Sequence, residues 1–222
     1  MSPGGRLPTR RPIPRPPAAV LFDMDGVLVD TFNAWVAVLE ECRRRRGMPP
    51  LGVAAIRACW GQGINADCES IFPGEEPARL AREYDEEFLH HLGNIRTEDG
   101  VAQTVRALRR AGIKTAVVTN SPVALARRIV LEIGLSDGFD CLAGGDEVTR
   151  GKPDPELLLL ALRRLGADPA SAVLVGDTML DVVAARACGV ASIGYKLGGG
   201  DARVERLRDL FPMLNLAPPM GC

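Results

Sequence analysis

Aspartates directly follow two of the apolar runs in this sequence. Asp23 and Asp25 stand after one run, and Asp177 and Asp181 stand after another. Carboxylates that crowd together repel one another, so a cluster of them needs a cation. Oxygen ligands of this kind favour Mg²⁺ over zinc. These residue types therefore predict a magnesium site, provided that the fold brings the two segments together.

Three further polar residues extend this chemistry. Thr119 and Asn120 follow a third apolar run, and Lys152 precedes a helical pattern that starts near Pro153. A divalent cation beside an ammonium group and a hydroxyl is suited to phosphate, because the cations neutralise the dianion and the hydroxyl orients it. Asp23 could then attack phosphorus. Asp25, two residues further on, could protonate the leaving oxygen.

Each of these residues also has a purely structural interpretation. An aspartate at a strand end often forms an Asx-turn or caps a helix. Asn120 could simply cap the helix that starts near Pro122. Asp181 could lie on a solvated helix face, and Lys152 could lie on the surface. The functional interpretation therefore depends on all the segments together and on none of them alone.

The elements that must position these residues alternate along the chain. Short apolar runs of strand length suit strands that are covered on both faces, as in a parallel sheet. Helical patterns lie between them, and this alternation predicts a doubly wound α/β sheet, which binds ligands at the carboxyl ends of its strands. The predicted strands are Ala18–Phe22, Lys114–Val118, Cys141–Ala143, Ala172–Val175 and Val190–Ile193.

One segment breaks the alternation. Residues 32–96 contain helical patterns but no convincing strand, which predicts a small all-helical cap domain inserted after the first strand. The α/β core then comprises residues 18–31 and 97–213. The Pro- and Arg-rich residues 1–17 are predicted to form a disordered tail, and residues 214–222 a second tail. The predicted helices of the insertion are Phe32–Arg46, Val53–Trp60, Asn65–Phe72 and Pro77–Leu92.

Four motifs together resemble those of the haloacid dehalogenase superfamily. They stand in the family's order over about residues 18–197, and the helical insertion resembles the family's cap of the first type. The core of that family is Rossmann-like. The motifs are Asp23-Met24-Asp25-Gly26-Val27-Leu28-Val29-Asp30-Thr31, then Thr119 at the end of a strand, then Gly151-Lys152-Pro153-Asp154-Pro155, and finally Gly176-Asp177-Thr178-Met179-Leu180-Asp181.

The resemblance implies a role for each motif residue. Asp23 is expected to form a phosphoaspartyl intermediate, with Asp25 as general acid and then general base. Mg²⁺ is expected to bind Asp23, the Asp25 carbonyl and Asp177, with Asp181 acting directly or through water. The phosphoryl oxygens are expected to contact three further residues, Thr119, Asn120 and Lys152.

Asp25 also narrows the chemistry within the family. True dehalogenases have no acid at this place, so Asp25 favours transfer from a phosphate ester. Phosphonoacetaldehyde hydrolases use a cap lysine, and residues 32–96 contain none. A phosphatase is the leading hypothesis, and a phosphomutase resembling beta-phosphoglucomutase is the alternative. A non-catalytic interaction protein has no need of Asp23 or Lys152.

The insertion is expected to determine the substrate specificity. Ile56–Gly63 resembles the cap stretch of phosphoglycolate phosphatases, so 2-phosphoglycolate is the first substrate hypothesis. A sugar phosphate, another phosphate ester of a specific pathway and pyrophosphate are the alternatives. Arg57 and Gln62 are the polar residues expected to face the substrate. The structural alternative is a joint between two helices with Arg57 in solvent.

Composition sets the remaining expectations. The 222 residues are 46% hydrophobic and 25% charged, as in a globular protein, with a formal net charge of -1. Such a balance does not indicate a nucleic acid or membrane partner. The six cysteines form no metal-binding or redox pattern, which favours a reducing cytoplasm. The expected form is a cytoplasmic monomer or homodimer that acts on a small phosphorylated metabolite.

Overall fold

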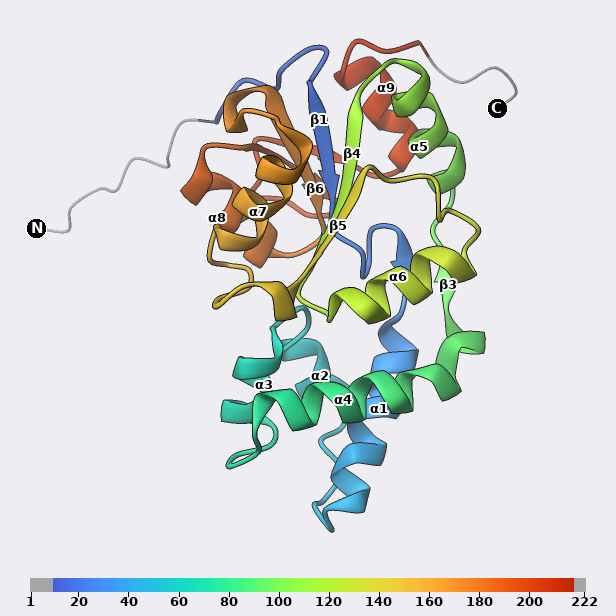
Figure 1. The fold of residues 1–222 in the computed structure, drawn as a ribbon, viewed down its shortest axis with the longest axis vertical. Coiled ribbons are helices and arrows are strands. Elements are labelled where there is room, and N and C mark those ends of the chain that lie inside the picture. Colours follow the sequence, from blue (N-terminus) through green and yellow to red (C-terminus); the bar gives the residue numbers. More distant parts are fainter. Residues whose placement is uncertain (1–9, 218–222) are drawn as a thin grey trace, which may run out of the picture.

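The computed structural model describes residues 10–217, which form a six-stranded sheet and the helices around it (Figure 1). All strand pairs in this sheet are parallel, in the order β5-β4-β1-β6-β7-β8. The five predicted strands are confirmed, and the short edge strand β8 is additional. The bounds are β1 Ala19–Phe22, β4 Lys114–Thr119, β5 Cys141–Gly144, β6 Ala172–Gly176, β7 Ala191–Tyr195 and β8 Ala202–Val204.

Helices cover both faces of the sheet, which explains why its strands are continuously apolar. Along β1, Val20 and Phe22 belong to one hydrophobic cluster, and Ala19 and Leu21 belong to the other. α5 and α6 cover the first face together with α9, and α7 and α8 cover the second (Figure 1). The helix bounds are α5 Val101–Arg110, α6 Val123–Glu132, α7 Glu156–Leu165, α8 Met179–Cys188 and α9 Leu210–Met213.

The predicted helical insertion lies beyond the carboxyl ends of the strands (Figure 1). At its base, β2 (Val29–Asp30) and β3 (Arg96–Thr97) form an antiparallel pair, so the chain enters and leaves the insertion side by side. The helix predicted to end at Leu92 ends instead at Phe88 and continues as a 3₁₀ turn. The insertion contains α1 Phe32–Arg45, α2 Val53–Ala58, α3 Ile64–Ser70, α4 Pro77–Phe88 and the 3₁₀ turn Leu89–Asn94.

Side chains of α1 contact the end of α3 and the side of α4. The buried Arg43 donates from Nη1 to the Ile71 carbonyl at 2.8 Å and from Nε to the Pro49 carbonyl at 2.9 Å. Trp35 packs edge-on against Tyr84 of α4, with ring centroids 5.4 Å apart. A buried guanidinium with carbonyl partners and packed aromatic rings both favour one relative placement of the helices.

The predicted tails need correction where the structure describes them. Arg11 donates its backbone N–H to Asp201 at 2.7 Å, Ile13 packs against the core, and Pro17 is buried. Residues 11–17 therefore lie along the core. At the other end the core continues past residue 213, because Leu214 is buried. Residues 1–9 and 218–222 lie outside the described residues. Within residues 10–217, no helix combines the length and apolar character that a membrane span needs.

Candidate active site

Asp23 and Asp25 follow the central strand β1, at the point in the sheet where the chain connections change direction. β1 lies between β4 and β6, so Asp23 emerges with a parallel strand on either side. Thr119 ends β4, and Asp177 follows β6. The carboxyl ends of parallel strands meet at one edge, where doubly wound folds bind ligands. This topology unites residues that are about 150 positions apart in the sequence.

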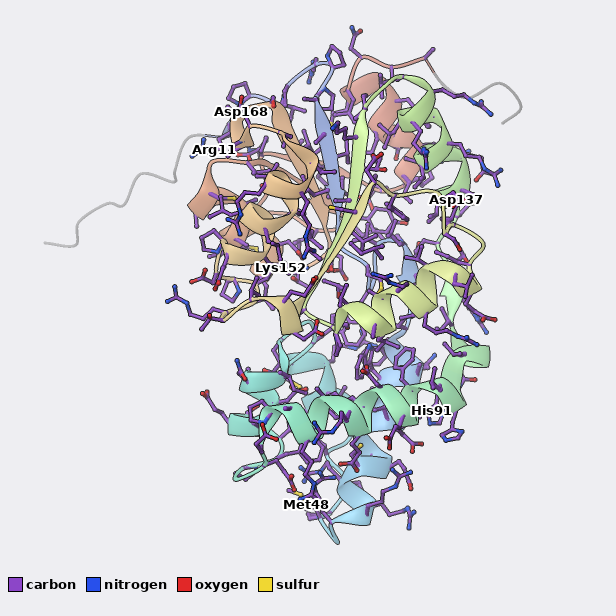
Figure 2. The ribbon with its side chains drawn as sticks, in the orientation of Figure 1. Arg11, Met48, His91, Asp137, Lys152 and Asp168 are labelled. Atoms are coloured by element: carbon purple, nitrogen blue, oxygen red, sulfur yellow. The ribbon has the colours of Figure 1, made fainter. Side chains whose placement is uncertain are left out.

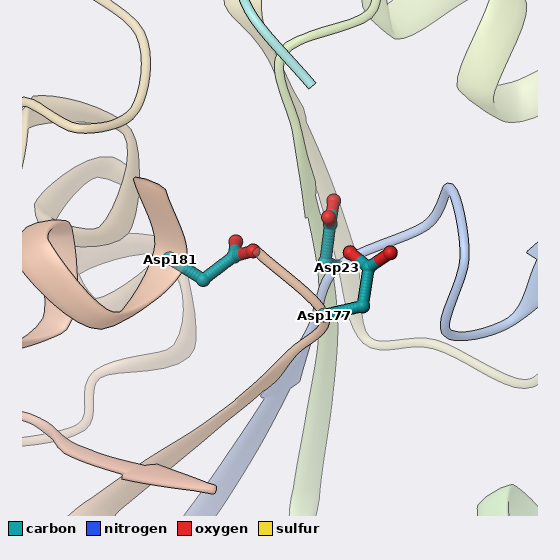
Figure 3. Close-up of side chains that lie close together, drawn as sticks. All are labelled: Asp23, Asp177 and Asp181. Carbon is teal, nitrogen blue, oxygen red and sulfur yellow. The ribbon is translucent and has the colours of Figure 1, made fainter. Parts of the chain in front are cut away.

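Three carboxylates converge at this edge. Asp23, Asp177 and Asp181 each offer an oxygen, and these atoms lie within 4.8 Å of one another (Figure 3). Asp181 lies in the first turn of α8, where Thr178 caps the helix and donates its N–H and hydroxyl to Asp181 Oδ2 at 3.1 and 2.7 Å. With 1% of its surface exposed, Asp181 is not on a solvated face. Local helix capping therefore orients one member of the cluster.

Lys152 supplies the positive charge of the cluster. Its Nζ lies 2.7 Å from both Asp23 Oδ1 and Asp181 Oδ1, and it donates to the Val118 carbonyl at 3.1 Å. Figure 2 shows Lys152 where the sheet meets the insertion. Burial disfavours the ammonium charge, but the Asp181 and Asp23 carboxylates outweigh burial and raise the pKa of Lys152 above its usual value. Lys152 is buried, which excludes the surface interpretation.

The cluster carries more negative charge than Lys152 neutralises. Burial, followed by the Asp181 carboxylate, raises the pKa of Asp23 and raises the pKa of Asp177 to about 7. Asp177 Oδ1 is buried and has no hydrogen-bond partner among the described residues. A divalent cation would occupy that acceptor and lower these pKa values. The donor set is all oxygen and fits Mg²⁺.

Gly26 gives a test of the cluster's geometry. A Cβ at this residue would lie 2.0 Å from Asp177 Oδ2, and the φ of Gly26 is +81°. We expect Gly26→Ala to displace the Asp177 carboxylate and to lower kcat on p-nitrophenyl phosphate by about 10- to 100-fold, as displacements near 1 Å do. Gly112→Ala is the matched control, because Gly112 has a φ of +72° but no atom within 4 Å of the added Cβ. Equal activities of the two variants would contradict the placement of Asp177 in the active site.

Asp25 lies beside the cluster in a shell of neutral donors. Trp35 Nε1 and the hydroxyls of Thr119 and Ser121 each lie 3.3 Å from its carboxylate, and the Thr31 hydroxyl also donates to it. Burial nevertheless raises the pKa of Asp25. A carboxyl with a raised pKa is suited to exchanging protons. Sequence reasoning missed these contacts of Thr31, Trp35 and Ser121, although Thr31 ends the first motif and Ser121 directly follows Asn120.

Asn120 joins the core to the insertion. Its Oδ1 accepts from the Lys152 N–H at 2.8 Å, and its Nδ2 donates to the carbonyls of Gly61 at 2.8 Å and Lys152 at 2.9 Å. Both amide protons are therefore engaged by protein carbonyls. Of the three residues expected to hold phosphate, Thr119 donates to Asp25 and Lys152 forms an ion pair with Asp23. The side chain of Asn120 instead fixes the Lys152 loop and the Gly61 loop.

A cavity separates the aspartates from the insertion, and the two predicted substrate-facing residues differ in their relation to it. Gln62 lines the cavity and donates to Asp67 at 2.6 Å. Arg57 is not among the lining residues, because its guanidinium lies 4.0 Å from the centroid of the Phe32 ring, over its face. The cavity wall includes both tryptophans of the chain, a compositional signal that sequence reasoning did not use. The aromatic residues that line it are Trp35, Trp60 and Tyr84.

The fold and the site together define an α/β enzyme with an acidic centre at the carboxyl edge of a parallel sheet. The family model described as haloacid dehalogenase-like hydrolase matches residues 20–195, and the chain belongs to this family. The predicted fold and the predicted family are both confirmed. The expectation of a phosphoric monoester hydrolase is also confirmed, because relatives that match the chain over most of its length are named phosphatases.

The chain is similar over most of its length to phosphatases named for different substrates. It is 33% identical to N-acetylmuramic acid 6-phosphate phosphatase of Pseudomonas aeruginosa, over 90% of this chain and 95% of the relative. It is 34% identical to phosphoglycolate phosphatase of Xanthomonas campestris, over 83% and 87%. The solved structure of CbbY from Rhodobacter sphaeroides, in complex with phosphate, shares the fold with a TM-score of 0.80 at 24% identity, over 90% of this chain and 100% of CbbY.

Proposed function

We propose that this chain is a Mg²⁺-dependent phosphatase that hydrolyses a small phosphorylated metabolite through a phosphoaspartyl intermediate on Asp23. The buried Lys152 ammonium group carries the proposal, because it lies 2.7 Å from both Asp23 and Asp181. It holds the Asp23 carboxylate in a fixed position as the nucleophile and partly neutralises the charge of the cluster. A scaffold would gain nothing from three repelling carboxylates at this edge.

The steps follow from the positions of the two motif aspartates. A carboxylate oxygen of Asp23 attacks phosphorus, and the bond from phosphorus to the leaving oxygen breaks as Asp25 gives that oxygen a proton. Asp25 then takes a proton from water, the water oxygen attacks phosphorus, and the bond to Asp23 breaks to release phosphate. Mg²⁺, held by Asp23, Asp177, Asp181 and the Asp25 carbonyl, would neutralise charge on the phosphoryl oxygens.

The insertion acts as the cap in this proposal. Residues 32–96 supply the cavity wall opposite the aspartates, and the hydrogen bond from Asn120 to the Gly61 carbonyl joins the two regions. A cap in this position excludes water during transfer and contacts the leaving group. The relatives named for different substrates agree with this division, in which the core performs the chemistry and the cap selects.

The phosphomutase alternative makes a different demand on the cap. A mutase that passes through a bisphosphate must hold a second phosphate on the leaving side, which needs cations there. Within residues 10–217, Lys152 is the one cationic side chain that lines the cavity, and it is bonded to Asp23 and Asp181. The charge of the cavity therefore favours hydrolysis.

Asp25→Asn tests the mechanism directly. The p-nitrophenolate leaving group needs no proton, so this variant should still form the phosphoaspartyl enzyme but should hydrolyse it at least ~100-fold more slowly, which is the size of a general-base contribution. We expect acid quenching followed by borohydride reduction to convert Asp23 to homoserine, detected by peptide mass. Unreduced Asp23 during turnover would argue against the covalent intermediate. Absence of phosphate release by the unaltered enzyme with Mg²⁺ would overturn the proposed activity as a whole.

A further inference from the structure

We propose that the buried carboxylate of Asp67 in the cap is the specificity determinant of this enzyme, and that it selects a neutral leaving group with hydroxyls, such as a sugar, over a leaving group that carries a carboxylate. The proposal rests on the proposed phosphatase activity and names the substrate class of that site. It differs from the 2-phosphoglycolate hypothesis, which followed from the resemblance of the Ile56–Gly63 stretch.

Asp67 is a buried acid in the wall of the cavity, held by two neutral donors. It lies on α3, with 8% of its surface exposed. Gln62 Nε2 lies 2.6 Å from its Oδ1, and the Tyr84 hydroxyl lies 2.9 Å from its Oδ2. Within residues 10–217, no lysine, arginine or histidine forms an ion pair with it. A buried carboxylate without a cation is costly unless other donors satisfy it.

The number of donors separates Asp67 from Asp25. A carboxylate has about four lone-pair sites for hydrogen bonds. Four side chains donate hydrogen bonds to the Asp25 carboxylate, whereas two described side chains donate to the Asp67 carboxylate. Asp67 therefore keeps unused acceptor capacity, and it is one of the residues that line the cavity. Burial raises the pKa of Asp67 to about 6, so the group still carries negative charge near pH 7 and above.

A chain of contacts places Asp67 on the leaving-group side. Trp35 donates to Asp25, which protonates the leaving oxygen. The Trp35 ring packs against Tyr84, and the Tyr84 hydroxyl donates to Asp67. All of these residues line the cavity. A leaving group attached to the oxygen beside Asp25 would thus extend along Trp35 and Tyr84 towards Asp67.

Charge then decides which leaving group fits. The carboxylate of 2-phosphoglycolate would face the Asp67 carboxylate, with Lys152 already paired to two aspartates. Two like charges in a desolvated cavity repel strongly. A hydroxyl donates to Asp67 without that repulsion, and the C–H face of a sugar ring can cover the aromatic wall formed by Trp35, Trp60 and Tyr84. The two carbons of glycolate would leave most of that wall bare.

Asp67→Asn tests this selection, because it keeps the shape and removes the charge. In the unaltered enzyme, we expect kcat/KM for glucose 6-phosphate or N-acetylglucosamine 6-phosphate to exceed that for 2-phosphoglycolate at least ~10-fold. In Asp67→Asn, kcat/KM for the hexose phosphates should fall ~10-fold and that for 2-phosphoglycolate should rise ~10-fold. Hydrolysis of p-nitrophenyl phosphate reports the phosphatase chemistry independently of this selection.

Asp85→Asn is the matched control. Asp85 is a second carboxyl in the insertion whose pKa is raised to about 6 by burial, but it does not line the cavity. This variant should keep the substrate ranking of the unaltered enzyme. The proposal is overturned if 2-phosphoglycolate is the better substrate of the unaltered enzyme. It is also overturned if Asp67→Asn lowers kcat/KM for all three substrate types equally, since that result would assign Asp67 to the fold.

Discussion

Asp23→Asn should lower kcat by at least ~10³-fold on every phosphate ester, a change in the activation barrier of about 4 kcal/mol or more. The amide keeps the size of the side chain but lacks the charge that attacks phosphorus. The substitution also weakens one ligand of the proposed metal site. Lys152 would keep Asp181 and the Val118 carbonyl as partners, so its position should persist. The measurement is steady-state turnover of p-nitrophenyl phosphate with saturating Mg²⁺.

The fold of the Asp23→Asn variant should remain intact. Asp23 is one of three crowded carboxylates, and burial already raises its pKa. Removing one of those charges relieves repulsion, so we expect the Tm to be unchanged or higher. Asp137→Asn makes the same chemical change at an exposed residue remote from the cluster and should keep full activity (Figure 2). A tenth of normal turnover in Asp23→Asn would exclude Asp23 as the nucleophile.

Removal of divalent cations should lower turnover about as much as the Asp23→Asn substitution does. We expect EDTA to lower turnover at least ~10³-fold and Mg²⁺ to restore it, because the cluster needs a cation to bring a phosphate dianion beside its carboxylates. Ca²⁺ should inhibit, since it accepts more and longer oxygen contacts and would hold Asp23 away from phosphorus. Full turnover in EDTA would contradict the ligand roles of Asp177 and Asp181.

Thermal unfolding reports Mg²⁺ binding at the same site without the need for turnover. A cation that binds only the folded chain raises its Tm, so Mg²⁺ should stabilise the EDTA-treated protein. Asp177→Asn should lose most of this stabilisation, because Asp177 Oδ1 is buried, has no hydrogen-bond partner among the described residues and can therefore accept a cation. Asp137→Asn should keep it. If Mg²⁺ raised the Tm of Asp177→Asn as much as that of the unaltered protein, the cation would not bind at this cluster.

The core and the aspartates at the ends of its strands were predictable because their signals are local. A short apolar run such as Ala18–Phe22 suits a strand that is buried on both faces, and the aspartates that follow it then stand at the strand's end. The rule for doubly wound sheets then brings Asp23, Thr119 and Asp177 to one edge without further information. The glycines that end helices, such as Gly166 and Gly189, are equally local, and both adopt the left-handed conformation.

Short strands and the chain ends were less predictable. β8 has three residues at the edge of the sheet and only Val204 among them is buried, so its hydrophobic pattern is weak. The proline-rich residues 11–17 have the composition of a tail, yet Pro17 is buried and the half-buried Ile13 packs against the core. Composition reports the average tendency of a segment, whereas a few contacts decide its place.

Only the tertiary structure showed which side chains of the insertion line the cavity. Arg57 and Gln62 lie five positions apart, but packing turns Arg57 onto Phe32 and Gln62 onto Asp67. Asp67 and Tyr84 come from different helices, and nothing in either helix by itself indicates that they meet. Helix patterns specify which faces are buried, but the angles and registers at which helices pack depend on side chains far apart in the sequence. The phosphoryl chemistry was therefore predictable from the chain alone, and the charge of the leaving-group pocket was not.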